Sequence, residues 1–220
     1  MKMPRVTRDN SRPLHLIWIC DCSGSMAADG KIQCLNTAIR ESLPLIRKVA
    51  DKNPYCSIRV LKFSSGAEWI NKDPIPLENF SWSDLDTSST DRDIGSALSM
   101  VAEEMKILPM SQRSLPPVLI LIASGSPTDD FNKGLKKLLD EPWGKRAVRI
   151  GIGIGSDAEI DVLQKFINNP EIKPYFAHNA QDLIKFIRWI FGALTQRCIP
   201  PSEEILMLSL LLDDVSKEIW

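Results

Sequence analysis

The sequence predicts an α/β protein with a doubly wound, mostly parallel sheet, Rossmann-like in plan, and helices on both faces of the sheet. Residues 14–20 and 118–123 are apolar without alternation, which is typical of strands buried on both faces. Segments with apolar residues at helical spacing lie between such strands. Because strand and helix alternate almost throughout, right-handed crossovers should make the strands parallel and place helices on either side.

The first half of the chain supplies three strands and two helices. They are a strand at 14–20, a helix at 31–50, a strand at 57–63, a short partner strand at 67–70 across the turn at 64–66, and a helix at 94–108. Pro44 should kink the first helix or end its first part, because proline cannot donate the internal hydrogen bond. Residues 71–90, rich in Pro, Ser and Asp, are expected to form a long surface connection.

The second half continues the alternation. It predicts a strand at 118–123, a helix through Phe131 and Leu139, a strand at 147–154, a short helix at 157–167, an edge strand at 175–177 and an amphipathic helix at 180–194. With 220 residues, the chain is long enough for one well-buried domain and an appendage. We expect a flexible segment at 1–13, one domain at 14–197 and a C-terminal helical extension at 198–220.

The extension is a candidate association surface. Two prolines at 200–201 stop the preceding helix, Ser202 can cap a new one, and residues 205–219 are rich in Leu. Residues 202–220 either fold back on the domain or pair with a second copy of the chain. The sharper alternative is that they dock a specific partner helix.

Composition argues against several classes of protein. The net charge is −1 and the pI is about 6.2, so no nucleic-acid partner is predicted. The amino terminus lacks the apolar core of a secretory signal, and no apolar stretch is long enough to span a bilayer. We therefore expect a cytoplasmic protein with no membrane partner. The five cysteines include no Cys-x-x-Cys pair, which argues against zinc and against a disulfide framework.

The most informative motif is Asp-Cys-Ser-Gly-Ser-Met at residues 21–26, directly after the first predicted strand. A hard divalent cation such as Mg2+ takes oxygen ligands at about 2.0 to 2.1 Å in an octahedron. The carboxylate of Asp21, the hydroxyls of Ser23 and Ser25, and several waters meet that demand, while Gly24 permits a tight turn. The alternative is that Asp21 and Ser23 are only turn and helix-capping residues.

This motif after a buried strand resembles the first metal-binding loop of von Willebrand factor A (VWA) domains, whose metal-ion-dependent adhesion site (MIDAS) binds acidic partners. The resemblance covers roughly residues 12 to 195 by the order of elements. It is closest to the TerY-like VWA proteins of bacterial tellurium-resistance and stress operons. Residues 118–130, Val-Leu-Ile-Leu-Ile-Ala-Ser-Gly-Ser-Pro-Thr-Asp-Asp, are similar to their strand followed by Thr-Asp-Gly-x-Pro-Thr-Asp. Ligands of such sheets bind at the carboxyl ends of the strands, where the three loops should converge.

The resemblance implies a divalent-metal site formed by three loops. Its predicted ligands are Asp21, Ser23 and Ser25 of the first loop, Thr90 of the second and Ser124 of the third. The family's third loop offers an aspartate where this chain has Ser124, so one negative charge is missing. In the second loop Arg92 occupies the family's threonine position, and a two-residue insertion would restore Thr90 to the site. An inward Arg92 would repel the cation by about 4 kcal/mol at 4 Å.

Four further aspartates in the second and third loops have two interpretations. Asp91, Asp93, Asp129 or Asp130 would compensate for the missing charge, directly or through water. Alternatively they cap helices and supply first-turn charge, which we favour for Asp93 and Asp129.

The charge count predicts how such a site works. A divalent cation held by one carboxylate keeps about one unit of positive charge and an open coordination position, which an Asp or Glu of a partner completes. We therefore predict an interaction module, not an enzyme, with Mg2+ (or Mn2+ or Ca2+) as cofactor. The resemblance suggests a bacterial stress, tellurite-resistance or phage-defence operon, with a kinase or phosphatase of the same operon as a candidate partner.

Two alternatives belong to other classes. One is a metal-independent assembly subunit that associates through its C-terminal helix. The other is a serine-type or metal-dependent hydrolase that uses Asp21, Ser23 and a histidine, with His15 and His178 as the only candidate bases. A simpler interpretation of these two histidines is that His15 is a packed or edge residue of the first strand and that His178 is a surface residue.

Overall fold

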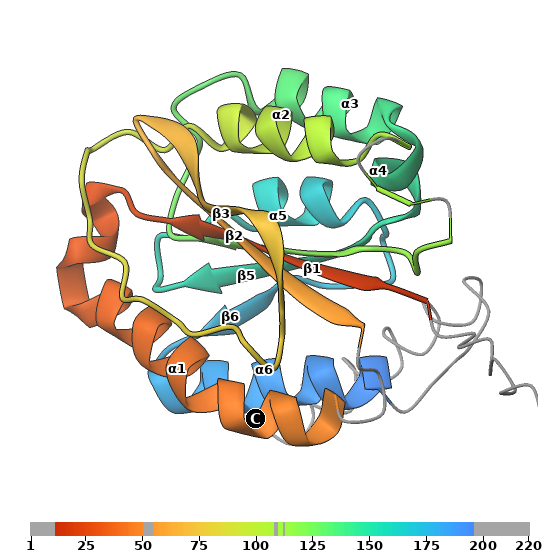
Figure 1. The fold of residues 1–220 in the computed structure, drawn as a ribbon. Helices are drawn as coiled ribbons and strands as arrows, with labels where there is room; N and C mark the ends of the chain where they lie inside the picture. Colours follow the sequence, from red (N-terminus) through yellow and green to blue (C-terminus); the bar gives the residue numbers. More distant parts are fainter. Residues whose placement is uncertain (1–11, 51–54, 108–109, 112, 196–220) are drawn as a thin grey trace, which may run out of the picture.

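The computed structural model describes residues 12–50, 55–107, 110–111 and 113–195, and within them the chain forms one six-stranded sheet in the order β3-β2-β1-β4-β5-β6 (Figure 1). Its strands are β1 (Leu14–Asp21), β2 (Cys56–Ser64), β3 (Gly66–Pro76), β4 (Val118–Ala123), β5 (Val148–Ile154) and β6 (Tyr175–Ala177). All neighbouring strands pair in parallel except β2 and β3, which form an antiparallel hairpin at one edge. The predicted α/β class with a mostly parallel sheet is confirmed.

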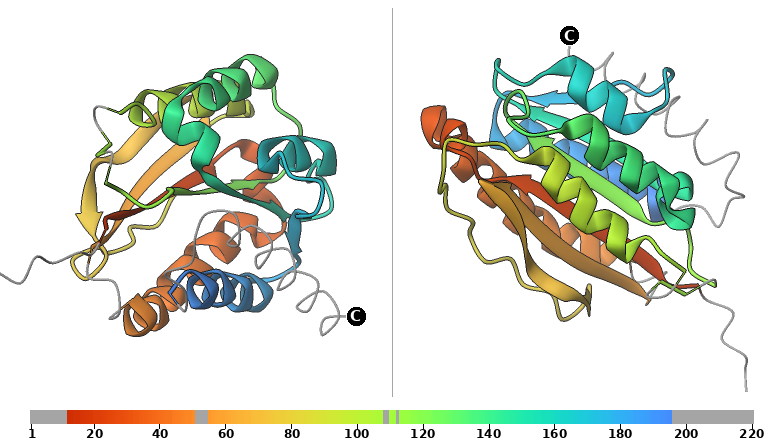
Figure 2. Two further views of the ribbon diagram at one scale, coloured as in Figure 1. Left: turned by 90° about the vertical axis from the view of Figure 1, so that its right-hand side faces the viewer. Right: turned by 90° about the horizontal axis from the view of Figure 1, so that it is seen from above.

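Helices cover both faces of the sheet (Figures 1 and 2). The helical elements are η1 (Gly24–Gly30), α1 (Lys31–Ala50), α2 (Ile94–Glu104), α3 (Phe131–Asp140), α4 (Pro142–Arg146), α5 (Ile160–Ile167) and α6 (Ala180–Thr195). Helices α1 and α6 lie side by side on one face, and α2, α3 and α5 lie on the other. None of the helices in the described part of the chain is long and apolar enough to cross a membrane.

The central strand β1 shows why its sequence has no polar alternation. Leu16, Trp18 and Cys20 pack with α1 and α6, while Ile17 and Ile19 point to the opposite face and pack with α2. All five are fully buried. Successive side chains of a strand point to opposite faces, so a strand with helices on both sides needs apolar residues at every position.

Two boundaries differ from the sequence prediction. Helix α1 continues through Pro44, which lies on the exposed side, where water can satisfy the backbone carbonyl that proline leaves free. Strand β3 extends from Gly66 to Pro76, well beyond the predicted 67–70. The side chain of Asn71 bridges an irregular register, since it accepts from Val60 N and donates to Ile58 O at 2.9 Å each. Prolines are tolerated there because β3 is an edge strand.

The remaining predicted elements are present, but α2 and α5 are shorter than predicted, since α5 begins at Ile160. Helix α2 ends at Glu104, and the end predicted at Leu108 lies outside the described residues. The short elements η1 and α4 were not predicted. The predicted extension at 198–220 also lies outside the described residues.

The connection from Leu77 to Asp93 brings the second loop to the carboxyl ends of the strands. It packs Leu77 and Leu85 against the α1 face of the core. The side chain of Asn36 on α1 fixes its path: Asn36 Nδ2 donates to Leu85 O, and Asn36 Oδ1 accepts from Leu85 N, at 2.9 Å each. This buried side-chain amide makes the same pair of hydrogen bonds to Leu85 that a neighbouring backbone strand would make, and so it holds the loop in place.

Candidate metal-binding site

Three loops meet at the carboxyl ends of β1 and β4, which are neighbours in the sheet. The first follows β1, the second precedes α2 and the third follows β4. Backbone hydrogen bonds join the first two loops, from Ser88 N to Cys22 O at 2.9 Å and from Gly24 N to Ser89 O at 2.5 Å. Parallel neighbouring strands end at the same edge, so loops distant in sequence form one surface.

The side chain of Asp21 is fully buried at this edge. One carboxylate oxygen accepts from Ser23 N at 2.8 Å, and the other accepts from Ser124 N and Ser124 Oγ at 2.9 Å each. No cationic side chain of the described residues forms a salt bridge with it. A buried carboxylate without an opposite charge is costly, so three donors balance it only in part.

Hydroxyl groups continue from this carboxylate in a chain. Ser124 Oγ lies 2.6 Å from Ser25 Oγ, and Ser25 Oγ lies 2.8 Å from Ser23 Oγ. Adjacent ligands of an octahedral Mg2+ stand about 2.8 to 3.0 Å apart, because the metal–oxygen distance is about 2.0 to 2.1 Å. The four side chains therefore supply oxygen donors close to the spacing that one hard cation requires.

Thr90 and Arg92 take different positions relative to this group. Thr90 lies next to Gly24. A Cβ added to Gly24 would stand 3.6 Å from the Cα of Thr90 and 3.7 Å from its methyl carbon. The hydroxyl of Thr90 is not part of the hydrogen-bonded chain. Arg92 lies over Gly125 of the third loop, where an added Cβ would be 3.1 Å from Arg92 Nε, and it donates to Ser126 O at 2.7 Å. The guanidinium thus borders the site.

The nearby aspartates bind backbone or side-chain donors of the chain itself. Asp129 accepts from Gly95 N at 2.8 Å and Ser96 N at 2.7 Å, so it caps the first turn of α2. Asp130 accepts from Lys133 N at 2.9 Å as the N-cap of α3. Asp93 accepts from Gly66 N at 2.7 Å and from Thr128 Oγ1 at 3.0 Å, which ties the β2–β3 turn to the third loop.

Asp91 is the remaining candidate. Its carboxylate lies 3.5 Å from Ser89 Oγ within the second loop, a contact at the limit of hydrogen bonding. Among the four aspartates, it is the one least committed to internal donors.

Lys31 is a buried charge at the same edge of the sheet, next to the loop after β5, that the sequence did not predict. It is the first residue of α1, is buried, and pairs with Asp157 after β5 at 2.8 Å. Its side chain passes close to Gly155, whose φ of +81° suits glycine. A lysine at a helix N-terminus opposes the helix dipole, and this mismatch was the available signal of a special position.

The donor chemistry fits a divalent cation. Asp21 would supply the negative charge. Ser23, Ser25 and Ser124 would supply neutral oxygen ligands, and water molecules would complete the coordination shell. Nowhere among the described residues do three His, Cys, Asp or Glu side chains gather. A cation held here would therefore keep much of its charge.

Of the two candidate bases, His15 lies far from the Asp21 site. His15 stands six residues before Asp21 on β1, about 20 Å along the strand. Burial, and then the charge of Arg59, lower its pKa to about 4. His15 Nδ1 lies 3.4 Å from Ser57 Oγ. Burial, with a smaller contribution from the charge of Asp21, raises the pKa of the Cys22 thiol to about 12, so that thiol is a packed group.

The fold has clear relatives among solved structures, while sequence comparisons give none. No protein-family model matches the chain, and no curated protein matches it. The ArnB paralog VWA2 from Sulfolobus acidocaldarius aligns with a TM-score of 0.60 at 19% identity, over 81% of this chain and 45% of that one. A von Willebrand factor type A protein from Catenulispora acidiphila aligns with a TM-score of 0.61 at 15% identity, over 83% and 42%.

A third relative is proximal thread matrix protein 1 from the mussel byssus, in a structure with a zinc-occupied MIDAS motif. It aligns with a TM-score of 0.60 at 16% identity, over 84% of this chain and 48% of that protein. The chain thus spans less than half the length of these three proteins. At such identities the likeness shows the fold alone, which is that of a VWA domain.

Proposed function

We propose that this protein is an interaction module that holds a divalent cation on Asp21, Ser23, Ser25 and Ser124 and binds an acidic group of a partner protein. The observation that carries the proposal is the buried Asp21 carboxylate, which no described cation neutralises, at the start of a chain of three hydroxyls. The zinc-occupied MIDAS of the byssus protein supports a metal at the corresponding edge of this fold.

The lack of a carboxylate in the third loop determines how strongly the site binds a metal ion. Ser124 donates to Asp21 where a second carboxylate would contribute another negative charge. Intrinsic metal affinity should therefore be weak, and the bound ion should attract a partner's carboxylate strongly. In this proposal the metal and the partner bind with positive coupling, each raising the affinity of the other.

The biological setting belongs to the same proposal. The resemblance of residues 118–130 to the TerY-like proteins supports a role in a bacterial stress or tellurite-resistance operon, with a kinase or phosphatase as partner. Purification of the two proteins after co-expression, with and without a chelator, tests that role. Co-purification that is insensitive to both chelator and the Asp21→Asn substitution would contradict a metal-dependent contact.

Calorimetric titration with Mg2+ and Mn2+ tests the site itself. Wild type should bind Mn2+ weakly, and an Asp-containing peptide should tighten that binding. The Asp21→Asn variant should lose the heat of binding, because it removes the only charge among the proposed ligands. Asp161→Asn, which neutralises an exposed carboxylate in the first turn of α5, is the matched control. The metal site is excluded if neither ion binds wild type with the peptide present, or if Asp21→Asn binds as tightly.

Water-proton relaxation of Mn2+ adds a readout of the open coordination position. If a partner carboxylate completes the coordination shell, the peptide should displace water from the ion and lower the relaxation enhancement. An unchanged enhancement at saturating peptide would mean that the acid group binds elsewhere.

A further inference from the structure

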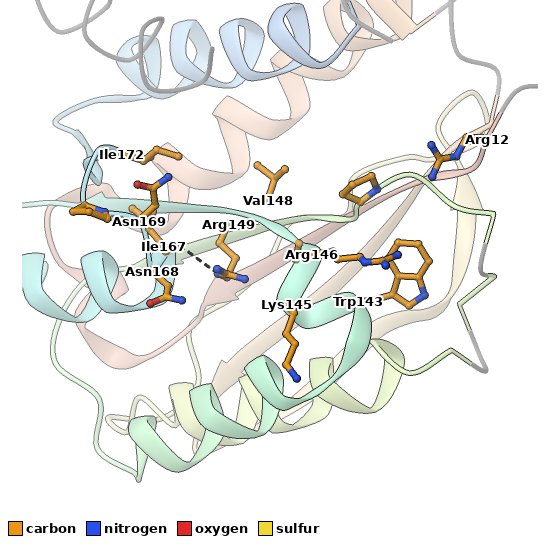
Figure 3. Close-up of a pocket in the computed structure, with 13 residues that line it drawn as sticks. Arg12, Trp143, Lys145, Arg146, Val148, Arg149, Ile167, Asn168, Asn169 and Ile172 are labelled. Atoms are coloured by element: carbon orange, nitrogen blue, oxygen red, sulfur yellow. Dashed lines mark hydrogen bonds between the residues drawn. The ribbon is translucent and has the colours of Figure 1, made fainter. Parts of the chain in front are cut away.

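A cavity lies at the opposite end of the sheet from the Asp21 site. It has a volume of about 560 Å³ and opens beside the amino-terminal ends of β4 and β5. It is lined by Arg12, Pro116, Trp143, Lys145, Arg146, Ala147, Val148, Arg149, Ile167, Asn168, Asn169, Pro170 and Ile172. Figure 3 shows the lining, from Ile172 and Asn169 at one end to Arg12 at the other. This volume is in the usual range for small-molecule sites.

The charge of this cavity is one-sided. Four of its lining residues, Arg12, Lys145, Arg146 and Arg149, are cationic, and none of the lining residues is acidic. None of the four forms a salt bridge with a residue that the structure describes. Like charges gathered in a concave surface repel one another and focus a positive potential, which an anion relieves.

Arg149 fixes the base of the cavity. Its Nε donates to Phe166 O at 2.9 Å and Ile167 O at 3.3 Å, and its Nη1 donates to Gly144 O at 2.7 Å. These bonds tie the end of α5 to α4, while burial lowers the pKa of the guanidinium. A guanidinium has five N–H donors, so Arg149 keeps donors that these carbonyls do not use.

Arg146 is held in place by an aromatic ring. Its Cζ lies 5.6 Å from the centroid of the Trp143 ring, within cation–π range. The indole N–H of Trp143 is itself buried and has no hydrogen-bond partner in the described structure. An ordered guanidinium loses less entropy on binding, and planar N–H pairs match phosphate oxygens.

We propose that this cavity is a binding site for a phosphate-bearing anion, independent of the Asp21 site. A phosphate group carries close to two negative charges at neutral pH and several acceptor oxygens, and so suits several cations better than a single carboxylate does. In this proposal Arg146 and Lys145 contact the phosphate. Arg149 holds the walls of the cavity in place and adds to its positive electrostatic potential. The apolar side chains of Val148, Ile167 and Ile172 offer a surface to the organic part of a ligand. The phosphate comes either from a free ion or from an organic ester.

Calorimetry at low ionic strength with inorganic phosphate, pyrophosphate and ADP tests the proposal. Pyrophosphate or ADP should bind, and the affinity should fall about tenfold in Arg146→Ala and again in Lys145→Ala. Arg146→Lys keeps the charge but not the planar donors, so it should recover only part of the loss. Lys133→Ala, which removes an exposed charge at the start of α3, is the control and should bind as wild type does.

Two results overturn the proposal. One is no binding of any of the three probes to the wild-type protein, and the other is equal affinity in wild type and Arg146→Ala when circular dichroism shows both folded. Tighter binding of ADP than of pyrophosphate assigns the site to organic phosphate esters. Equal or weaker binding of ADP assigns it to free phosphate ions. Asp21→Asn should leave this binding unchanged.

Discussion

The two ends of the sheet carry charges of opposite sign, the buried Asp21 and the half-buried Arg149, and each is held largely by backbone groups rather than by an opposite charge. At the carboxyl ends, Asp21 accepts from Ser23 N and Ser124 N. At the amino ends, Arg149 donates to the carbonyls of Gly144 and Phe166. Backbone dipoles neutralise a charge less completely than a counterion does, so both ends retain affinity for an ion of opposite sign.

The two ends differ in the side chains that are available to bind an ion. The carboxyl end offers small hydroxyls from three residues of two loops, close to one point, which suits a single small cation. The amino end offers long cationic side chains around a volume of about 560 Å³, which suits a larger anion. Four substitutions test this comparison, and their expected effects decrease in the order Ser124→Asp, Arg149→Met, His15→Gln and Arg92→Ala.

Among these substitutions, Ser124→Asp should lower the stability of the protein most, through its effect at the carboxyl ends of the strands. It places a second carboxylate beside the buried Asp21, and like charges in that setting should lower stability by about 2 to 4 kcal/mol. For a chain of this length the melting temperature should fall by roughly 10 °C. Millimolar Mg2+ should restore most of the loss, because a divalent cation neutralises the pair.

Thermal melts with and without Mg2+ measure this effect, and Ser126→Asp is the matched control. Ser126 is exposed on the same loop, so the same added charge, together with loss of the hydrogen bond to Glu159, should lower stability by at most about 1 kcal/mol. A Ser124→Asp protein that is as stable as wild type without metal would show that the two side chains do not face each other.

At the amino end, Arg149→Met should have the next largest effect. Methionine keeps much of the apolar stem but leaves the carbonyls of Gly144, Phe166 and Ile167 without their donor, at a cost of about 2 to 3 kcal/mol. Urea unfolding measures it, with the exposed Arg188→Met on α6 as control. Equal midpoints for the two variants would mean that Arg149 does not hold α4 and α5 together.

The histidine at the start of β1 should make the amino end sensitive to acid. His15 has a pKa of about 4 in the folded protein against 6.5 as its ordinary value, because of burial and then the charge of Arg59. The unfolded chain therefore binds more protons between these values, so stability is intact above pH 6.5 and falls as the pH drops toward 4.

Partial exposure of His15 limits the loss to about 1 kcal/mol between pH 7 and pH 5. The His15→Gln variant should lack this part of the pH dependence in urea unfolding, whereas His178→Gln, at an exposed position, should retain it. If wild type and His15→Gln lost stability in parallel, the acid sensitivity would have another source.

The smallest effect should come from Arg92→Ala. Removing a cation that borders the metal site should raise the affinity for Mn2+ a few-fold, since the interaction is screened by solvent. Loss of the bond to Ser126 O should lower stability by at most about 1 kcal/mol. Calorimetric titration checks the affinity, with Arg40→Ala on α1 as control. Weaker Mn2+ binding in Arg92→Ala would mean that the guanidinium supports the third loop more than it repels the ion.

The candidate site could be predicted in part because its residues follow strands that the sequence marks clearly. Asp21 ends β1 and Ser124 comes directly after β4, two neighbouring buried strands, so their meeting follows from strand order. Thr90 and Arg92 could not be placed, because they lie in a long connection whose path depends on Asn36 of α1. The extent of β3 was missed for a similar reason, since the side chain of Asn71 replaces regular pairing there.

Local sequence pattern was enough to predict the α/β class, the parallel core strands and the motif at 21–26, because apolar periodicity and turn residues act over a few neighbouring positions. Which side chains share a site depended on long-range packing. It placed the Arg92 guanidinium over Gly125, gave Asp129 to the first turn of α2, and brought cations from three segments to one cavity. Such contacts join residues far apart in the chain, and packing rather than local pattern selects them.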